Sequence, residues 1–348
     1  MTRADDRVAD RAAGQGGEQD PGPAMFDLIT GYWRSQVIGA AARLRITDAV
    51  ADGPRTAAQI AQALDLHAGA TARLLSALAA LGVVRRSGDQ FSLTPLGATL
   101  RSVPGSMRDY AVAELARGHW LPWGEIDDVI RTGDRAPPRI LGQELWEYYG
   151  QQPEEAEAFS GAMSGLSAMV AGDLVASGLV PPGRTVIDIG GAHGILVRAV
   201  LEADPTARGI LFDLPHVAPT ARAEIEAAGL GGRCAVVGGD FFADVPEGDV
   251  YLVKHILHDW DDAQCVAILK NCARRMRPGG SVIVVEMVVP EEDRLTPARM
   301  MDMNMLVMLP GRERTEAEYS GLFEAAGLKL AETRPSRLEF RMMRAVAA

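Results

Sequence analysis

The stretch Thr185-Val-Ile-Asp-Ile-Gly190-Gly-Ala-His-Gly194 decides the fold, because an apolar strand runs directly into a glycine-rich turn and then a helix. Apolar runs of strand length recur after it, and segments of helix length, such as 262–276, lie between them. Buried continuous strands separated by helices predict a parallel α/β sheet with right-handed crossovers. The expected strands cover residues 185–190, 209–213, 234–240, 249–255 and 281–286.

The glycine turn at 190–194 suits close approach of the backbone to a ligand, because glycine tolerates unusual φ/ψ values. Asp213 ends the next strand, where a carboxylate can accept hydrogen bonds from both ribose hydroxyls. The spacing is not the Gly-x-Gly-x-x-Gly of nicotinamide enzymes. A turn that serves only helix packing remains the alternative at this point.

The N-terminal part has a different pattern. Residues 26–51 are predicted to be helical, residues 56–64 form a short helix capped by Thr56 or the residue before it, and residues 68–84 form a helix stopped by Gly82. A strand is expected over 91–97. Helix, turn, helix and a small β-wing together predict a winged helix.

Length and composition place the chain among soluble globular proteins. It has 348 residues, which favours about two domains, with 47% hydrophobic and 23% charged residues. Its net charge of −11 gives it no general attraction for nucleic acid or anionic lipid. The three cysteines, Cys234, Cys265 and Cys272, have no CxxC spacing and are expected to be reduced thiols of a cytoplasmic protein.

We expect four segments along the chain. Residues 1–22 are polar, lack the apolar stretch of a signal peptide and are predicted to be a disordered tail. Residues 23–106 form the winged-helix domain, 107–180 a helical linker, and 181–348 the α/β domain. No uninterrupted apolar run reaches the roughly 18–20 residues of a membrane span.

Three motifs carry a family resemblance: Lys254-His-Ile-Leu-His-Asp-Trp-Asp-Asp-Ala-Gln-Cys265, Arg277-Pro-Gly-Gly280 and Gly311-Arg-Glu-Arg-Thr-Glu-Ala-Glu-Tyr319. From about residue 25 to 348 the chain resembles the S-adenosylmethionine-dependent O-methyltransferases of the plant caffeate/flavonoid type, in their bacterial natural-product (polyketide) branch. The resemblance implies a Rossmann-like, mostly parallel seven-stranded sheet and an N-terminal winged-helix domain that makes a homodimer.

The resemblance also implies the cofactor, S-adenosylmethionine, which leaves as S-adenosylhomocysteine, with no metal. The implied cofactor-binding residues are Asp188, Gly190, Gly191, Asp213, Leu214, Gly239, Asp240, Phe241 and Lys254. The chain departs from the plant pattern of three successive glycines at Ala192 and His193. We expect His193 to be a solvent-facing loop residue.

By the same resemblance, His258 is the catalytic base. A neutral imidazole with a pKa near 6.5 can take the proton of a phenol while the methyl group is transferred. Glu286 and Glu313 are its implied acidic partners, which fix the tautomer and stabilise the imidazolium. Asp259 either positions the acceptor or caps the following helix, and His255 is expected to be a packing residue.

An apolar acceptor site is expected from the methionines and aromatics. Five methionines crowd residues 300–308, and some of them must simply be helix core. The residues predicted to bind the acceptor are Trp123, Trp146, Phe159, Met163, Met301 and Met305. Such a lining fits a small aromatic or polyketide molecule.

Two other functions compete with this prediction. A winged helix can read DNA, but the predicted reading helix, 68–80, carries Arg73 as its only cation, which is too little to neutralise phosphates. Some bacterial relatives use S-adenosylmethionine for hydroxylation or decarboxylation instead of transfer, and nitrogen is an alternative nucleophile to oxygen.

Overall fold

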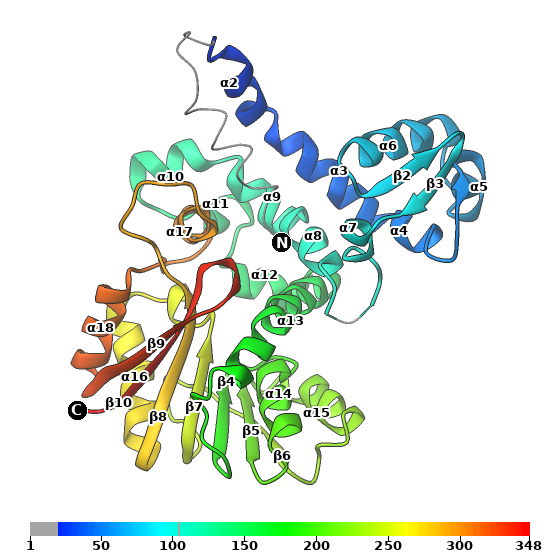
Figure 1. Cartoon of the computed structure of the whole chain (residues 1–348). Helices are drawn as coiled ribbons and strands as arrows, with labels where there is room; N and C mark the ends of the chain where they lie inside the picture. The colour runs from blue at the N-terminus through cyan, green and yellow to red at the C-terminus, as the bar shows by residue number, and fades with distance from the viewer. Residues whose placement is uncertain (1–19, 104) are drawn as a thin grey trace.

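The computed structural model describes residues 20–103 and 105–348 (Figure 1). Most of the predicted tail, residues 1–19, lies outside this range. Gly22, which we assigned to the tail, instead begins the first described helix, α2 (Gly22–Ile29).

The C-terminal domain is built on a seven-stranded sheet with the order β6-β5-β4-β7-β8-β10-β9. Five parallel strands coincide with the five predicted ones: β4 (Thr185–Ile189), β5 (Arg208–Asp213), β6 (Cys234–Gly238), β7 (Gly248–Lys254) and β8 (Met276–Met287). The antiparallel pair β9 (Leu328–Pro335) and β10 (Phe340–Ala347) completes the sheet and was not predicted strand by strand. The strand order reverses between β4 and β7, and ligands of α/β sheets bind at such a switch point.

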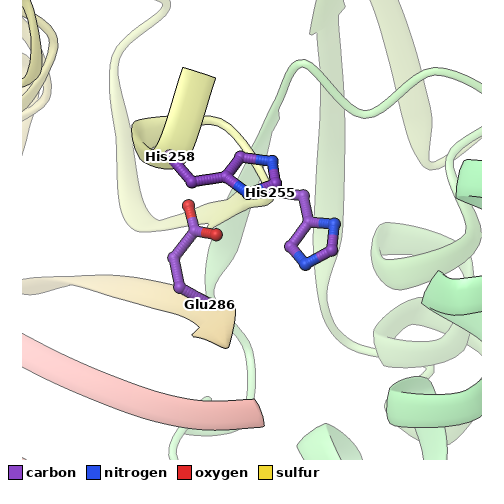
Figure 2. A group of neighbouring side chains, drawn as sticks. All are labelled: His255, His258 and Glu286. Carbon is purple, nitrogen blue, oxygen red and sulfur yellow. The ribbon is translucent and has the colours of Figure 1, made fainter. Parts of the chain in front are cut away.

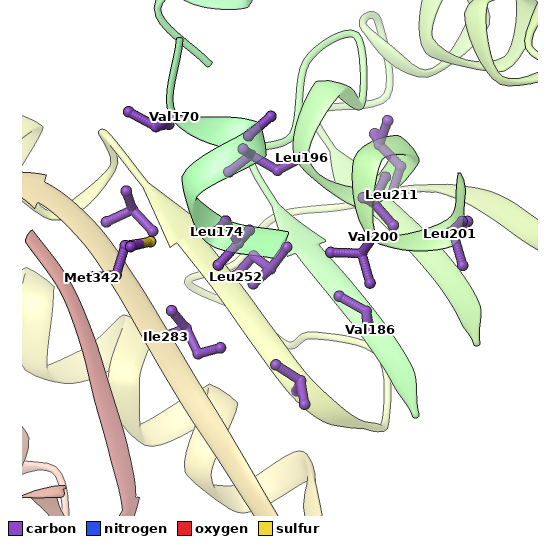
Figure 3. Packing of buried hydrophobic residues seen from close by; sticks show 14 of the residues in the cluster. Val170, Leu174, Val186, Leu196, Val200, Leu201, Leu211, Leu252, Ile283 and Met342 are labelled. Carbon is purple, nitrogen blue, oxygen red and sulfur yellow. The ribbon is translucent and has the colours of Figure 1, made fainter. Parts of the chain in front are cut away.

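Helices cover both faces of this sheet. On one face, α14 (Ile195–Ala203), α15 (Ala218–Ala227) and the end of α13 (Pro153–Ala176) bury Leu196, Val200 and Leu174 against Val186 and other strand residues (Figure 3). On the other face, α16 (Asp262–Arg275) and α18 (Glu316–Ala325) pack on the strands through a second buried cluster. The expected helix over 262–276 is confirmed except that Met276 already starts β8.

The N-terminal domain has the predicted winged-helix pattern. Its elements are α3 (Gly31–Arg43), α4 (Ile46–Ala49), β1 (Arg55–Thr56), α5 (Ala57–Ala63), α6 (Ala68–Ala80), β2 (Val84–Ser87), β3 (Gln90–Leu93) and α7 (Pro95–Ala98). Thr56 is the N-cap of α5, in a capping box with Gln59.

Three boundaries in this domain differ from the prediction. The helix expected over 26–51 is broken at Thr30 and again at Leu44. The helix expected to reach residue 84 ends at Ala80, and Val84 instead opens β2. The strand expected over 91–97 stops at Leu93, because Thr94 caps α7 and Pro95 suits the first turn of a helix.

Short helices connect the two domains, as predicted for residues 107–180. They are α8 (Arg108–Glu114), α9 (Arg117–Trp123), α10 (Ile126–Thr132), α11 (Pro137–Ile140) and α12 (Leu145–Gln151), followed by the long α13. Helix α17 (Pro297–Met308), inserted after β8, packs among them. Figure 1 shows α13 running from this helical region down to the sheet.

Helix α13 is the one helix in the described ranges whose length and apolar composition match those of a membrane span. The test concerns length and composition only, and core helices pass it too. Val170, Ala171 and Leu174 of α13 lie in the core cluster beneath α14. The helix is therefore a core element of this fold.

A single glycine in β5 lets α14 approach the sheet. A Cβ at Gly209 would lie 2.7 Å from Val197 Cγ2 and 3.0 Å from Leu201 Cδ1. We predict that Gly209→Ala lowers the free energy of unfolding by about 1–3 kcal/mol through overpacking, measured by urea denaturation. Gly172→Ala, on an exposed position of α13 with nothing within 4 Å of the new Cβ, is the matched control and should not destabilise. Equal stability of the two variants would contradict the packing argument.

Candidate active site

His258 lies in a buried turn just past the carboxyl end of β7, in a short 3-10 helix, η2 (Leu257–Asp259). The residue is 5% exposed. The Nδ1 atom is 2.7 Å from Glu313 Oε1, in the loop before α18, and Nε2 is 3.3 Å from Asp259 Oδ1. The structure thus brings together three of the four predicted catalytic residues in direct contact.

Two loops that meet backbone to backbone create this contact. A Cβ on Gly311 would lie 1.9 Å from the His258 carbonyl oxygen, so only glycine fits there. Arg314 is fully buried and donates hydrogen bonds to the carbonyl oxygens of Leu257 (3.0 Å) and Trp260 (2.9 Å). It also binds Asp262, which holds the catalytic turn and the 311–314 loop in one register.

Glu286, the fourth predicted catalytic residue, acts on the backbone of the turn. It ends β8, and its Oε1 accepts hydrogen bonds from the amides of Ile256 (3.1 Å) and Leu257 (2.9 Å). No hydrogen bond joins it to the His258 ring among the described residues. The geometry therefore distinguishes two acids that the sequence could not: Glu313 contacts the ring, and Glu286 holds the turn that carries it.

The alternative role for Asp259, as a helix cap, is wrong. The N-cap of α16 is Asp261, whose side chain accepts from the Gln264 amide in a capping box. Asp259 instead faces His258 Nε2.

Burial dominates the electrostatics of this cluster. It raises the pKa of Glu313 to about 8 and the pKa values of Glu286 and Asp259 to about 7; His258 opposes the shift for the latter two. Glu286 Oε2, Glu313 Oε2 and the Tyr319 hydroxyl are buried with no hydrogen-bonding partner in the part of the chain that the structure describes. The cluster can therefore hold a proton near neutral pH.

His255 packs against the ring of His258. Its ring centroid lies 4.3 Å from that of His258 and 4.8 Å from that of Phe340, as expected of a packing residue. Its backbone is left-handed, with φ +50°, and its Nε2 has no partner among the described residues. Figure 2 shows the two imidazoles beside Glu286.

The three side chains of Figure 2 resemble a metal site, since their ligand atoms lie within 4.8 Å of one another. A metal binds an imidazole nitrogen in the plane of the ring at about 2.0–2.1 Å. The two imidazoles instead pack against each other, with ring centroids 4.3 Å apart and planes tilted by 32°. This ring packing accounts for the proximity of the His255 and His258 nitrogens without a metal.

The glycine turn after β4 has the close packing expected of a cofactor cradle. Gly190 has φ +64°, and a Cβ on Gly191 would lie 2.8 Å from the Asp188 Cγ. Asp188 is buried, accepts a hydrogen bond from the Val197 amide at 3.2 Å, and has its pKa raised by burial to about 7. This backbone suits the amino-acid end of a cofactor.

Two carboxylates follow at the ends of the neighbouring strands. Asp213 accepts hydrogen bonds from the amides of Ala192 and Leu214, at 2.8 and 2.7 Å, which aligns it with the glycine turn. Asp240 accepts from the Phe242 amide at 2.9 Å, and Gly239 lies against the Phe212 ring. Both acids keep lone pairs for ligand hydroxyl or amino groups.

Apolar and basic groups complete this edge. Leu214 is 46% exposed, and Phe241 packs edge-to-face on Phe242 and Trp260, so each offers apolar surface to a flat base. Lys254 is buried, and desolvation lowers its pKa to about 8. The negative charges of Glu286 and Asp188 partly offset this by raising the pKa. The predicted cofactor residues therefore share one edge of the sheet and fit a nucleoside with a charged amino-acid arm.

His193 is not solvent-facing, which corrects the prediction. It is half-buried, and its Nδ1 lies 2.9 Å from the hydroxyl of Ser164 on α13. The cause is the left-handed turn at Ala192 and Gly194, which directs the intervening side chain toward α13.

The predicted acceptor residues lie on α9, α12, α13 and α17. Phe159 packs edge-to-face on Trp146 with centroids 5.6 Å apart, and Trp123 donates to Asn304 at 2.9 Å. Met301 lies in the cluster with Phe159 and Trp123, and Met163 packs beside Phe159 in a smaller cluster. Met305 and Met308 are fully buried core residues, whereas Met300 is half exposed.

Sequence reasoning missed several residues of this region. Asp302 accepts from the Glu313 amide at 3.0 Å and so ties α17 to the catalytic loop. The hydroxyl of Tyr149 lies 2.9 Å from Nδ1 of the buried His119. Arg314 belongs to the motif at 311–319, directly after Glu313. Its place in the sequence does not show that its side chain is buried and bonds to the His258 turn.

Comparison with known proteins identifies the family. A model of the O-methyltransferase domain matches residues 123–329, and a model of the O-methyltransferase dimerisation domain matches residues 26–102. The chain belongs to the O-methyltransferase family. It is an S-adenosylmethionine-dependent O-methyltransferase with the Rossmann-like fold of that family.

Individual relatives cover nearly the whole chain. The phenazine O-methyltransferase PhzM of Lysobacter antibioticus is 39% identical over 315 residues, which are 90% of this chain and 92% of that protein. The crystal structure of LaPhzM has a TM-score of 0.89 and 37% identity and covers 95% of this chain and 100% of its own. An O-methyltransferase from neocarzinostatin biosynthesis, solved with S-adenosylmethionine and 2-hydroxy-5-methyl naphthoic acid, has a TM-score of 0.74 and 33% identity, covering 90% and 96%.

The close approach at Gly311 gives a test of the loop geometry. We predict that Gly311→Ala displaces the His258 turn and lowers kcat at least about tenfold, since small misplacements of catalytic groups are costly. Binding of S-adenosylhomocysteine, followed by calorimetry, should change little. Gly321→Ala in α18, where a Cβ meets nothing within 4 Å, is the control. Normal turnover by Gly311→Ala would show that the turn is not held by this contact.

Proposed function

We propose that the protein methylates a hydroxyl group of a small aromatic or polyketide-type natural product, with His258 as the general base. The observation that carries the proposal is the 2.7 Å contact between His258 Nδ1 and Glu313 at the carboxyl end of β7. A carboxylate on Nδ1 favours the tautomer whose Nε2 is free to accept a proton. The names of relatives that act on phenazines, and the naphthoic acid in a neighbouring structure, support an aromatic acceptor.

The protein's part in the reaction is positioning and proton removal. S-adenosylmethionine supplies an activated methyl group, so the chain has to orient the acceptor oxygen and take its proton. His258 Nε2 takes that proton, Glu313 stabilises the resulting imidazolium from the Nδ1 side, and Glu286 keeps the turn rigid through its two backbone bonds. Asp259, 3.3 Å from Nε2, orients the hydroxyl as it approaches.

The cofactor is assigned to the edge formed by the glycine turn and strands β4 to β7. Its amino-acid end is assigned to Asp188, Gly190 and Gly191. Its ribose is assigned to Asp213 and Leu214, and its adenine to Gly239, Asp240 and Phe241. Lys254 helps to hold the cofactor. The acceptor is assigned to Trp123, Trp146, Phe159, Met163 and Met301, whereas the sixth predicted residue, Met305, is part of the helical core. Two connections to the His258 turn support these assignments. Lys254, a cofactor residue, ends the strand directly before the turn. Helix α17, which carries Met301, is bonded to the loop of Glu313 through Asp302.

The assembly is proposed to be a homodimer formed by the N-terminal domain. Helix α2 has no buried residue, and Phe26, Leu28 and Trp33 are each more than half exposed. In Figure 1 α3 packs into the N-terminal domain, and α2 projects beyond it as an arm. An exposed apolar surface of this kind marks an interaction site, and a family dimerisation domain covers it.

The first test removes the base. We predict that His258→Ala lowers turnover at least about 10²-fold, the lower range for general base catalysis. Binding of S-adenosylhomocysteine should stay close to that of the wild type, because His258 is not among the residues assigned to the cofactor. Near-normal turnover of the variant at neutral pH would refute the assignment.

The second test separates the two glutamates. We predict that Glu313→Gln lowers kcat about tenfold or more, because an amide does not stabilise the imidazolium. Glu286→Gln should cost less, about threefold or below, since its amide oxygen still accepts the two backbone bonds. Steady-state kinetics at saturating cofactor measures both values. A larger loss at Glu286 would place the orienting acid there instead.

The transfer itself is tested with methyl-labelled S-adenosylmethionine and a panel of phenols, naphthols and phenazine alcohols, analysed by mass spectrometry. We expect label on oxygen as a methyl ether. Label on nitrogen, or a product that gains oxygen without label, would favour the competing chemistries. Specific DNA binding at physiological salt would favour a regulator.

A further inference from the structure

We propose that the hydrogen bond between His193 and Ser164 is a positioning contact that couples the cofactor loop to the helix carrying the acceptor residues. The bond joins Nδ1 of His193 to Oγ of Ser164 at 2.9 Å. The assignment of α13 to the acceptor site rests on the proposed function. The hydrogen bond between the loop and α13 is independent of that function.

The loop end of this contact is rigidly tied to the proposed cofactor site. His193 follows Ala192, which has φ +46° and whose amide donates to Asp213 Oδ2 at 2.8 Å. It precedes Gly194, with φ +72°, whose amide donates back to the Gly191 carbonyl at 2.7 Å. Because the backbone on both sides of His193 is fixed, a ligand that presses on the turn moves this side chain with it.

The helix end is equally specific. Ser164 is only 8% exposed, and His193 is the one hydrogen-bonding partner of its hydroxyl among the described residues. Serines in helices often bond to their own backbone instead, as Ser167 does to the Met163 carbonyl at 2.8 Å. Ser164 directly follows Met163, and Phe159 lies one turn earlier on the same helix.

The contact therefore links donor and acceptor across the active site. A shift of the turn on cofactor binding is transmitted to α13 through this part-buried hydrogen bond. Methyl transfer requires the two reactants to be aligned closely, and a link of this kind sets their relative position. By thermodynamic reciprocity, the acceptor must then strengthen cofactor binding as much as the cofactor strengthens acceptor binding.

The test is hydrogen exchange of the full chain with and without S-adenosylhomocysteine. In the wild type we expect the ligand to protect amides of α13 around residues 156–167 as well as the glycine turn. In Ser164→Ala and His193→Phe the protection of α13 should be lost while that of the turn remains. Ser167→Ala is the matched control, because its hydroxyl makes only a bond within the helix, and it should behave as the wild type.

A kinetic readout separates positioning from mere structure. We expect kcat/KM for the acceptor at saturating cofactor to fall about three- to tenfold in each single variant, the loss of one hydrogen bond. The double variant should be no worse than either, and His193→Asn, which keeps a polar atom near the Nδ1 position, should recover most of the rate.

Three results would overturn the coupling: protection of α13 that survives in Ser164→Ala, the same loss in Ser167→Ala, or additive losses in the double variant. The exchange experiment needs no acceptor. If no phenol is methylated but the protection pattern holds, the proposed function fails and the coupling stands; the reverse outcome removes the coupling alone.

Discussion

The active site depends on one buried ionic group, the Arg314 guanidinium. It lies between two loops that are more than fifty residues apart in sequence and satisfies carbonyl oxygens on the catalytic turn, at Leu257 and Trp260. A buried charge is tolerated only when it is paired and hydrogen-bonded, and here Asp262 provides the opposite charge. Glu313, directly before Arg314 in the sequence, contacts the His258 ring from the same loop.

Close backbone approach is the second constraint. Gly311 lies against the His258 carbonyl, Gly209 lets α14 reach the sheet, and Gly191 lies against Asp188. Each glycine marks a place where two elements meet with no room for a Cβ. The His258 turn is thus set by a backbone contact, whereas α14 and the glycine turn after β4 are set by side chains that pack directly on a glycine. This rigidity suits a reaction in which the protein supplies alignment.

Much of this was accessible from the sequence, because the parallel strands are nearly continuous apolar runs and their carboxyl ends carry Asp188, Asp213, Asp240 and Lys254. The motif around His258 predicted where the catalytic turn lies. What pattern reasoning missed depends on tertiary contacts between distant residues. Glu286 and Glu313 look alike in sequence, and only the packing of the 311–314 loop shows which one touches the ring. His193 was expected in solvent, and its bond to Ser164 joins residues 29 positions apart.

In the proposed mechanism His258, held by Glu313, removes the acceptor proton. A crystal structure of the protein with S-adenosylhomocysteine and a phenolic acceptor tests it most directly. We predict the acceptor oxygen at hydrogen-bonding distance from His258 Nε2, about 2.6–3.2 Å, with Glu313 retained on Nδ1. An acceptor bound in a productive position with its hydroxyl against another group, and His258 remote from it, would contradict the account.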